Sequence, residues 1–234
     1  MPGLIHIVGA RPNFIKAAPV VAALEAAGAE QQLIHTGQHY DRRMSEIFFE
    51  ELGLPEPDLN LGVGSGSHGT QTAALLVAME ETFTAAEPER VIVYGDVNST
   101  LAAALTCAKL GIAIAHVEAG LRSFDDTMPE EINRRVTDIL SDPLYVTAPE
   151  GEQNLAREGI SGERVVFVGN PMIDTLLAHL DRFDPAPIQA LLGLQPPYAV
   201  ATLHRPANVD TDEAASALVG ALRAATGRLP LVLP

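Results

Sequence analysis

The sequence predicts an α/β fold in which a parallel sheet carries helices on both faces. Short apolar runs rich in β-branched residues alternate with helical segments over the first 170 residues, which is the β-α-β-α order of parallel sheets. Glycines and polar residues follow the apolar runs, as expected where a strand turns into a helix. Hydrophobic residues make up 47% of the 234 residues, enough for a sizeable core.

The elements follow in order from this pattern. Pro12 suits the first position of a helix, and Gly53 and Gly111 are typical helix stops. The strands expected in the first part span residues 4–8, 31–36, 91–94, 112–117, 144–147 and 165–168. The helices expected between them start at Pro12 or span residues 42–52, 71–83, 98–109, 129–139 and 153–158.

A proline-rich stretch divides the chain. Prolines at 185, 187, 196 and 197 are the clearest boundary signal, and a helix over 172–180 precedes them. Beyond them we expect a strand over 198–203, a helix over 212–226 and a strand over 229–233. The sequence therefore predicts an N-terminal domain over 1–170 and, over 171–234, a connecting helix with the start of a second domain. One β-α-β unit is too small to be a domain by itself.

Composition excludes several classes of function. The formal net charge of −15 argues against general nucleic-acid binding. No apolar run approaches the length of a membrane span, and the N-terminus does not resemble a signal peptide. The single cysteine, Cys107, lies on an apolar helix face and is expected to be a core thiol. One cysteine allows no disulfide framework, which fits a reducing cytoplasm.

Two acidic residues are expected at one edge of the sheet. Asp96 follows the strand over 91–94 and the turn at Gly95, and Glu118 follows the next strand along the chain. Ligands of open α/β sheets bind beyond the carboxyl ends of the strands. The alternative is that Asp96 merely caps the following helix, but capping explains two such carboxylates less easily than one.

Positive charge is expected at the end of the first strand. Arg11 lies beside the start of the first helix, and Lys16 lies one turn further on. A helix N-terminus with two cations makes an anion site, but by itself this pattern is weak, and both residues could be surface charges.

Taken together, the motifs resemble those of the non-hydrolysing UDP-N-acetylglucosamine 2-epimerase family. The resemblance covers the chain from Leu4 to its end. The motifs occur in the order G-A-R-P-N-F-I-K, T-G-Q-H-Y-D, Y-G-D-V-N-S-T, H-V-E-A-G-L-R-S, M-P-E-E-I-N-R and L-H-R-P-A-N-V.

The resemblance implies a GT-B-like architecture of two Rossmann-like domains, the second incomplete in this chain. It implies interconversion of UDP-GlcNAc and UDP-ManNAc, by elimination of UDP to a 2-acetamidoglucal and its readdition. It also implies a cytoplasmic homodimer that needs no metal or redox cofactor and serves polysaccharide biosynthesis. Family members are longer, so the 234 residues alone are expected to be inactive.

The resemblance also assigns roles to residues. The catalytic residues it implies are Asp96, Glu118, Glu131 and His204. The substrate contacts it implies are Arg11, Lys16, Asp96, Glu118 and His204, and a regulatory segment would hold Gln38 and His39. Carboxylates partly desolvated in a cleft can have a raised pKa suited to moving the C2 proton.

Three alternatives remain open from the sequence. The substrate could be a related UDP-sugar such as UDP-2,3-diacetamido-glucuronate, although no extra cation for a uronate stands out. The protein could resemble the hydrolysing relatives, which release the free sugar. The chain could also be a truncated, non-catalytic partner subunit, which the presence of all four implied catalytic residues disfavours.

Overall fold

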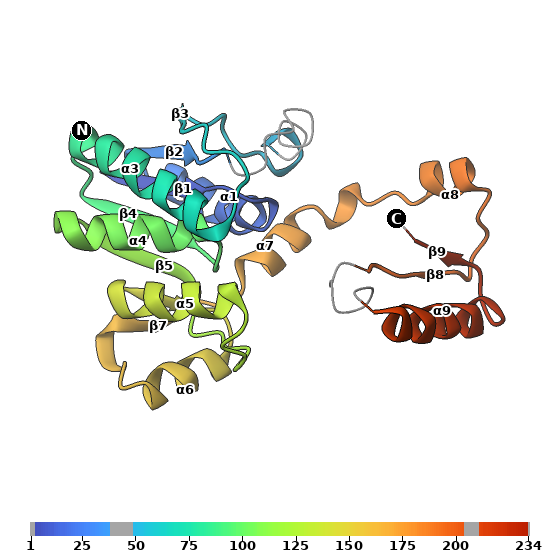
Figure 1. Ribbon diagram of the computed structural model, residues 1–234. Coiled ribbons are helices and arrows are strands. Elements are labelled where there is room, and N and C mark those ends of the chain that lie inside the picture. Colours follow the sequence, from blue (N-terminus) through green and yellow to red (C-terminus); the bar gives the residue numbers. More distant parts are fainter. Residues whose placement is uncertain (1–2, 38–48, 204–210, 234) are drawn as a thin grey trace. The chain divides into compact units, whose positions relative to one another are not determined.

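The computed structural model describes residues 3–37, 49–203 and 211–233 (Figure 1). The chain forms two compact units, Met1–His179 and Leu180–Pro234. In the described parts, no helix is both long and apolar enough to cross a membrane.

The first unit is built on a parallel sheet. Its described strands are β1 (Leu4–Val8), β2 (Gln31–His35), β3 (Leu59–Asn60), β4 (Arg90–Tyr94), β5 (Ala113–Ala119), β6 (Leu144–Val146) and β7 (Val165–Phe167). They lie in the order β3-β2-β1-β4-β5-β6-β7, and every neighbouring pair is parallel. The order reverses between β1 and β4, so this pair forms the topological switch point.

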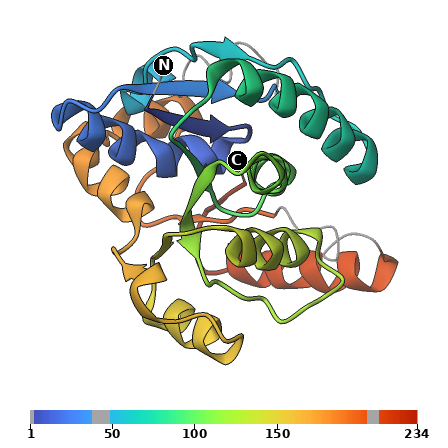
Figure 2. The ribbon, with the colours of Figure 1, turned by 90° about the vertical axis from the view of Figure 1, so that its left-hand side faces the viewer.

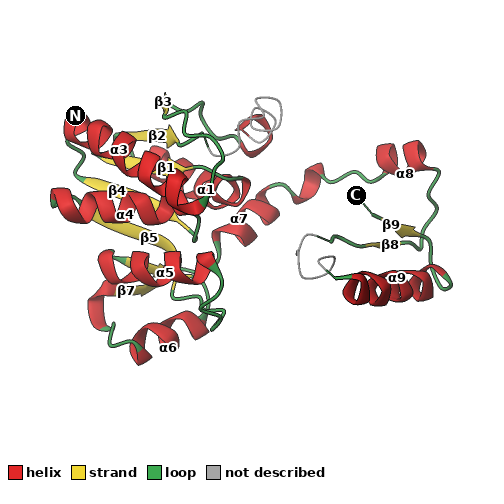
Figure 3. Ribbon diagram, in the orientation of Figure 1, coloured by secondary structure: helices red, strands yellow, loops and turns green. Residues whose placement is uncertain are grey.

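Helices cover both faces of this sheet, as the sequence predicts (Figures 2 and 3). They are α1 (Arg11–Ala26), α3 (His68–Ala86), α4 (Asn98–Leu110), α5 (Pro129–Leu140), α6 (Pro149–Arg157) and α7 (Pro171–Ala178), with a 3₁₀ turn at Gly162–Arg164. On one face, α1 packs Phe14 and Val21 against Tyr94. On the other, α3 and α4 pack Met79 and Cys107 against strands β1 and β4.

The thiol of Cys107 is part of the hydrophobic core. Cys107 is fully buried between α4 and the sheet, and its burial raises its pKa to about 12. The thiol is therefore protonated at neutral pH and is not a nucleophile, which confirms its expected place in the core.

The second unit contains one β-α-β unit in its described residues. Strands β8 (Ala199–Val200) and β9 (Leu231–Val232) pair in parallel, and α9 (Asp212–Thr226) connects them. The Thr211 hydroxyl caps α9 by accepting a hydrogen bond from the Ala214 N–H group. Within the second unit, a 3₁₀ turn at Leu180–Arg182 and helix α8 (Ala186–Leu192) come before β8 in the chain.

Some elements differ from the sequence prediction. The short strand β3 is not among the strands expected from the sequence. Helix α3 begins at His68 rather than Gln71, because Ser67 serves as its N-cap. Helix α8 lies within the proline-rich stretch, where Pro185 is its N-cap residue and Pro187 lies in its first turn.

The boundary between the two units lies later in the chain than the predicted domain boundary. Helix α7 belongs to the first unit, and the Thr175 hydroxyl donates a hydrogen bond of 2.7 Å to the Ile15 carbonyl of α1. The structure thus divides the chain after His179, whereas the sequence placed the boundary after residue 170. The assignment of these parts to domains stays a prediction.

The α3 contact with the sheet yields a stability prediction. Leu75 is fully buried and Val77 is 59% exposed on the same helix. We expect Leu75→Ala to lower the free energy of unfolding by about 3 kcal/mol, because it leaves a cavity beneath the sheet. Val77→Ala should change it by less than about 0.5 kcal/mol. Urea unfolding of both variants measures the difference, and equal effects would contradict the packing described.

Candidate functional site

The acidic and basic residues singled out in the sequence lie at the switch point of the sheet. Strands β1, β4 and β5 are adjacent and parallel, so their carboxyl ends share one edge. Arg11 begins α1 directly after β1, Asp96 follows β4, and Glu118 lies near the end of β5. This is the edge where open α/β sheets bind ligands.

A salt bridge joins helix α1 to the end of β5. The Lys16 ammonium group, one turn into α1, pairs with the Glu118 carboxylate, and their side chains are only 8% and 14% exposed. This pair brings together a residue expected to contact an anion and one expected to transfer protons. Arg11 is exposed at the first position of α1.

Gly95 makes room for this salt bridge. It has a φ angle of +64°, and an added Cβ atom would lie 2.8 Å from the Lys16 ammonium nitrogen and 3.2 Å from a Glu118 carboxylate oxygen. Its N–H group also donates a hydrogen bond of 3.0 Å to the Val117 carbonyl. The absence of a side chain at position 95 therefore lets the pair lie directly over the end of β4.

Glu118 reaches Lys16 through an irregularity in β5. The pairing register shifts between Val117 and Ala119, and Glu118 has a φ angle of +76°. A non-glycine residue with such a φ angle is strained, and strain of this kind gathers at functional sites. The local backbone conformation thus deviates from a regular strand at the residue whose carboxylate meets Lys16.

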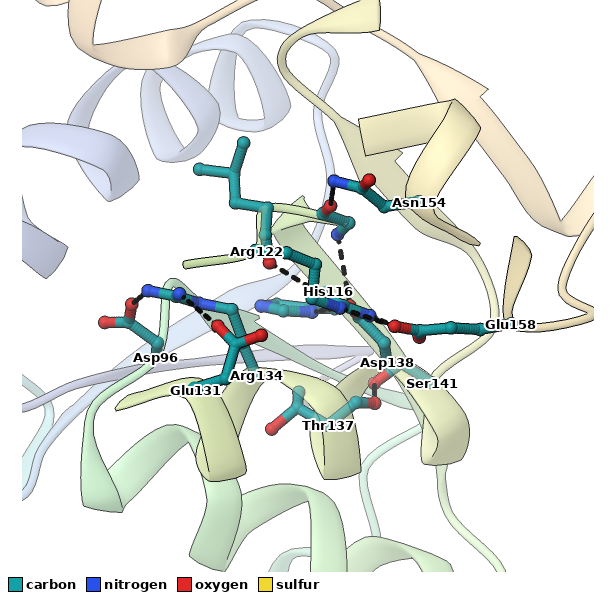
Figure 4. A network of polar contacts seen from close by, with 12 residues as sticks. Asp96, His116, Arg122, Glu131, Arg134, Thr137, Asp138, Ser141, Asn154 and Glu158 are labelled. Carbon is teal, nitrogen blue, oxygen red and sulfur yellow. Dashed lines mark hydrogen bonds and ion pairs between the residues drawn. The ribbon is translucent and has the colours of Figure 1, made fainter. Parts of the chain in front are cut away.

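A second ion-pair network holds the carboxylate of Asp96. Arg134 of α5 pairs with Asp96 through one guanidinium nitrogen and with Glu131, at 2.7 Å, through the other (Figure 4). The Asp96 side chain is 27% exposed, whereas that of Glu131 is 2% exposed. The N-cap of α4 is Val97, which makes no side-chain capping bond, so Asp96 is not the helix cap that the sequence left open.

Glu131 differs from the expectation of a raised pKa. Its burial would raise the pKa, but hydrogen bonds from the Ser123 N–H and hydroxyl groups and from Arg134 outweigh burial. The net result is a pKa below the usual value of a glutamate. The expectation was therefore wrong for Glu131, because three donors favour its charged form.

Two asparagine side chains form hydrogen bonds with the main chain at this edge of the sheet. The Asn13 side chain accepts hydrogen bonds from the Gly9 and Ala10 N–H groups, at 3.1 and 3.0 Å, and donates to the Tyr94 carbonyl at 2.8 Å. The Asn133 amide donates a hydrogen bond of 2.8 Å to the Asp96 carbonyl. The Asn13 amide thus connects α1 to the turn after β1 and to the end of β4, and the Asn133 amide connects α5 to the turn after β4.

The sequence analysis missed Asn13 and Arg134. Arg134 lies three residues after Glu131, so both are on one face of α5, and this spacing was the available signal. Asn13 lies at the third helical position of α1, where a side chain can bond back to the N-cap, which was its signal.

Three of the predicted site residues lie outside the described residues. They are Gln38, His39 and His204. Their roles stay predictions. Within residues 3–37, 49–203 and 211–233, no group of three or more His, Cys, Asp or Glu side chains is arranged to hold a metal ion.

Comparisons with known proteins agree on one family. A family model described as UDP-N-acetylglucosamine 2-epimerase matches residues 22–234. A UDP-N-acetylglucosamine 2-epimerase of Methanocaldococcus jannaschii is 44% identical over 211 residues, 88% of this chain and 58% of that protein. A UDP-2,3-diacetamido-2,3-dideoxy-D-glucuronate 2-epimerase of Pseudomonas aeruginosa is 44% identical over 235 residues, 99% of this chain and 66% of that protein.

A solved structure shows the same fold. The crystal structure of the M. jannaschii UDP-GlcNAc 2-epimerase in complex with UDP-GlcNAc and UDP superposes with a TM-score of 0.90 and 40% identity. The match covers 98% of this chain and 65% of that chain. The α/β, GT-B-like fold class expected from the sequence is therefore confirmed. The chain spans about three fifths of the length of the relatives it matches.

The lowered pKa of Glu131 predicts how stability depends on pH. Because the folded-state pKa is depressed, the stabilisation from the Glu131 carboxylate is present above its unfolded value of 4.5 and is lost as the pH falls through the folded value. Glu131→Gln should therefore be less stable than the wild type at pH 7, and the difference should shrink below pH 4.5. Urea unfolding across this range measures it; a difference that stays constant with pH would contradict the lowered pKa.

Proposed function

Because the chain belongs to the UDP-N-acetylglucosamine 2-epimerase family, we propose that its protein interconverts UDP-GlcNAc and UDP-ManNAc. The observation that carries the proposal is the placement of two carboxylates, each paired with a cation, around Gly95 at the switch point of the sheet. This arrangement offers acid–base groups beside positive charge. A reaction that moves a proton and releases a diphosphate needs both.

The proposed reaction has two balanced stages. In the first, a base takes the C2 proton while the C1–O bond breaks, so UDP leaves with the electron pair and a 2-acetamidoglucal forms. In the second, an acid returns a proton to the opposite face of C2 while a UDP oxygen bonds to C1. The sugar is neither oxidised nor reduced overall, so the reaction itself needs no redox partner.

We assign the proton transfers to Asp96 and Glu118. Both carboxylates lie at the ends of adjacent strands and both retain some exposure, at 27% and 14% of their side chains. Glu131 is 2% exposed and fully engaged by Ser123 and Arg134. In this arrangement Glu131 serves to hold Arg134 against Asp96, and a direct proton transfer would require it to give up those bonds.

We assign the binding of the substrate's diphosphate to the start of α1. Arg11 and the N-terminus of α1 supply positive charge at the edge, and Lys16 lies one turn further along the helix. His204 is proposed to act with them on the departing UDP. On the same family basis we propose a cytoplasmic homodimer of the non-hydrolysing type that requires no metal.

A second candidate substrate is a UDP-2,3-diacetamido-glucuronate. The observation that favours it is the match to the P. aeruginosa enzyme, which covers 99% of this chain at 44% identity. The two candidates share the C2 chemistry and differ in the groups at C3 and C6. The acid–base assignment above holds for either sugar.

The proposed function is tested by an activity assay on the whole protein, as its gene encodes it. Incubation with each UDP-sugar in D₂O, followed by NMR of the products, should yield the C2 epimer with deuterium at C2. The sugar should remain joined to UDP at equilibrium. Release of free sugar alone would identify the hydrolysing reaction, and no conversion of either UDP-sugar would overturn the proposed function.

Asp96→Asn should lower turnover by at least about 100-fold, since the amide cannot act as an acid or base at C2. Asp174→Asn, at an exposed position of α7, is the matched control and should retain wild-type turnover. Initial rates measured with both variants decide. An Asp96→Asn enzyme as fast as the control would remove Asp96 from the proton transfers.

Gly95→Ala tests the space occupied by the Lys16–Glu118 pair. Gly95 and Gly111 have φ angles of +64° and +71°, but an added Cβ atom at position 111 meets nothing within 4 Å. Because the two φ angles are similar, alanine should lower the free energy of unfolding by a similar amount at each position, about 1–2 kcal/mol. Only the change at position 95 pushes Lys16 and Glu118 apart, and a displacement of about 1 Å can cost about 100-fold in rate.

Thermal unfolding and turnover of the two glycine variants separate these effects. We expect similar losses of stability, with turnover lost only in Gly95→Ala. Equal turnover in the two variants would show that the geometry around Gly95 is irrelevant to the reaction.

A further inference from the structure

A second cluster of charged side chains lies near the Asp96–Arg134–Glu131 network (Figure 4). His116 of β5 and Asp138 of α5 are both 0% exposed, and the Arg122 side chain is 1% exposed. Charged groups are almost never buried to this extent unless they are paired. None of these three residues is a contact in the function proposed above, so their burial requires another explanation.

The Asp138 carboxylate is the centre of the cluster. One oxygen lies 2.7 Å from the Nδ1 atom of His116, and the other accepts from the Gly120 N–H group at 3.1 Å and pairs with Arg122 at 2.7 Å. Burial would raise the pKa of Asp138, but His116 and Arg122 hold it below its usual value. Asp138 is therefore ionised and accepts hydrogen bonds from all three partners.

The contacts of His116 fix its protonation. Its Nε2 atom lies 2.8 Å from the Gly95 carbonyl oxygen, which can only accept, so Nε2 carries a proton. Its Nδ1 atom faces the ionised Asp138, which also only accepts, so Nδ1 carries a proton as well. The imidazole is thus a cation that donates in two directions, to a main-chain turn and to a helix.

These bonds end on the two turns that carry the acid–base groups. Gly95 directly precedes Asp96, and Gly120 lies two residues after Glu118. His116 holds the first turn through its carbonyl, and Asp138 holds the second through its N–H group. One buried ion pair therefore connects both turns to each other and to α5.

We propose that His116 and Asp138 are positioning residues that fix the separation of the Asp96 and Glu118 carboxylates. They touch neither substrate nor reacting atoms and act through the main chain at Gly95 and Gly120. This inference deepens the proposed epimerase function and rests on it. Removing His116 alone leaves the buried Asp138 carboxylate without one partner and lowers stability, so the effect on the rate has to be compared with that of a variant that loses similar stability.

Two substitutions of His116 separate its two hydrogen bonds. The amide nitrogen of glutamine replaces Nε2 and can still donate to the Gly95 carbonyl, whereas that of asparagine replaces Nδ1 and can donate only to Asp138. Both variants lose the charge. We expect His116→Asn to lower kcat about 100-fold and His116→Gln at most about 10-fold, with KM changed less than about threefold in both.

His6 supplies the matched control. It is also fully buried in the sheet, on β1, where it contacts the Tyr94 hydroxyl at 2.7 Å and the Gln31 amide oxygen at 2.9 Å. Burial lowers its pKa to about 4, so it is neutral, and its contacts do not involve the turns at Gly95 and Gly120. His6→Asn should lose stability much as His116→Asn does while keeping wild-type kcat.

A double-variant comparison distinguishes positioning from a general structural role. If His116 acts through Asp96, His116→Asn should lower kcat less than about threefold in a protein that already carries Asp96→Asn. A general loss of structure would lower it by the same factor in both backgrounds. The measurements are steady-state kinetics on the whole protein with the UDP-sugar that the wild type converts.

The outcomes separate this inference from the proposed function. A wild type that converts neither UDP-sugar overturns the function and, with it, the positioning role. A wild type that is active while His116→Asn keeps its kcat, or loses no more than His6→Asn, overturns the positioning role alone. Should the His116 variants fail to fold, ¹⁵N NMR of the wild-type histidines decides: the two acceptors require hydrogen bonds donated by both His116 nitrogens, and a ring in which only one nitrogen donates would overturn the positioning role.

Discussion

The salt bridge between Lys16 and Glu118 is the interaction on which the site depends. It joins α1, the helix that follows β1, to the end of β5, and it lies over the end of β4, where Gly95 leaves the space it occupies. The strained φ angle of Glu118 and the register shift in β5 both serve this contact. The Asp96–Arg134–Glu131 network lies beside it and is fastened to α5, so the carboxylates of two strand ends are held by two separate cations.

The balance of charge at this edge bears on how an anion binds. Lys16 and Arg134 meet three carboxylates, those of Asp96, Glu118 and Glu131, so the paired groups together keep one negative charge. The whole chain has a formal net charge of −15. In the proposed function, a diphosphate would therefore be attracted by the start of α1 and by Arg11.

The sequence predicted the layout of the first unit and the edge where the polar residues gather. Asp96, Glu118 and Lys16 could be placed together because the carboxyl ends of parallel strands meet at one edge. Their pairing could not be predicted, since the bulge at Glu118 and the reach of Arg134 to Asp96 depend on tertiary contacts. His116 lies within an apolar strand pattern, and only the packing of α5 shows that Asp138 meets it. The short helix α8 was missed because Pro185 and Pro187 were interpreted as boundary signals rather than as the N-cap and the first turn of a helix.

A crystal structure of the whole protein with UDP-GlcNAc bound tests the central claim most directly. The claim is that the carboxylates around Gly95 act on C2 of the sugar. The structure should place C2 within about 3.5 Å of a carboxylate oxygen of Asp96 or Glu118, close enough for proton transfer. A bound sugar whose C2 atom is out of reach of both carboxylates would contradict it.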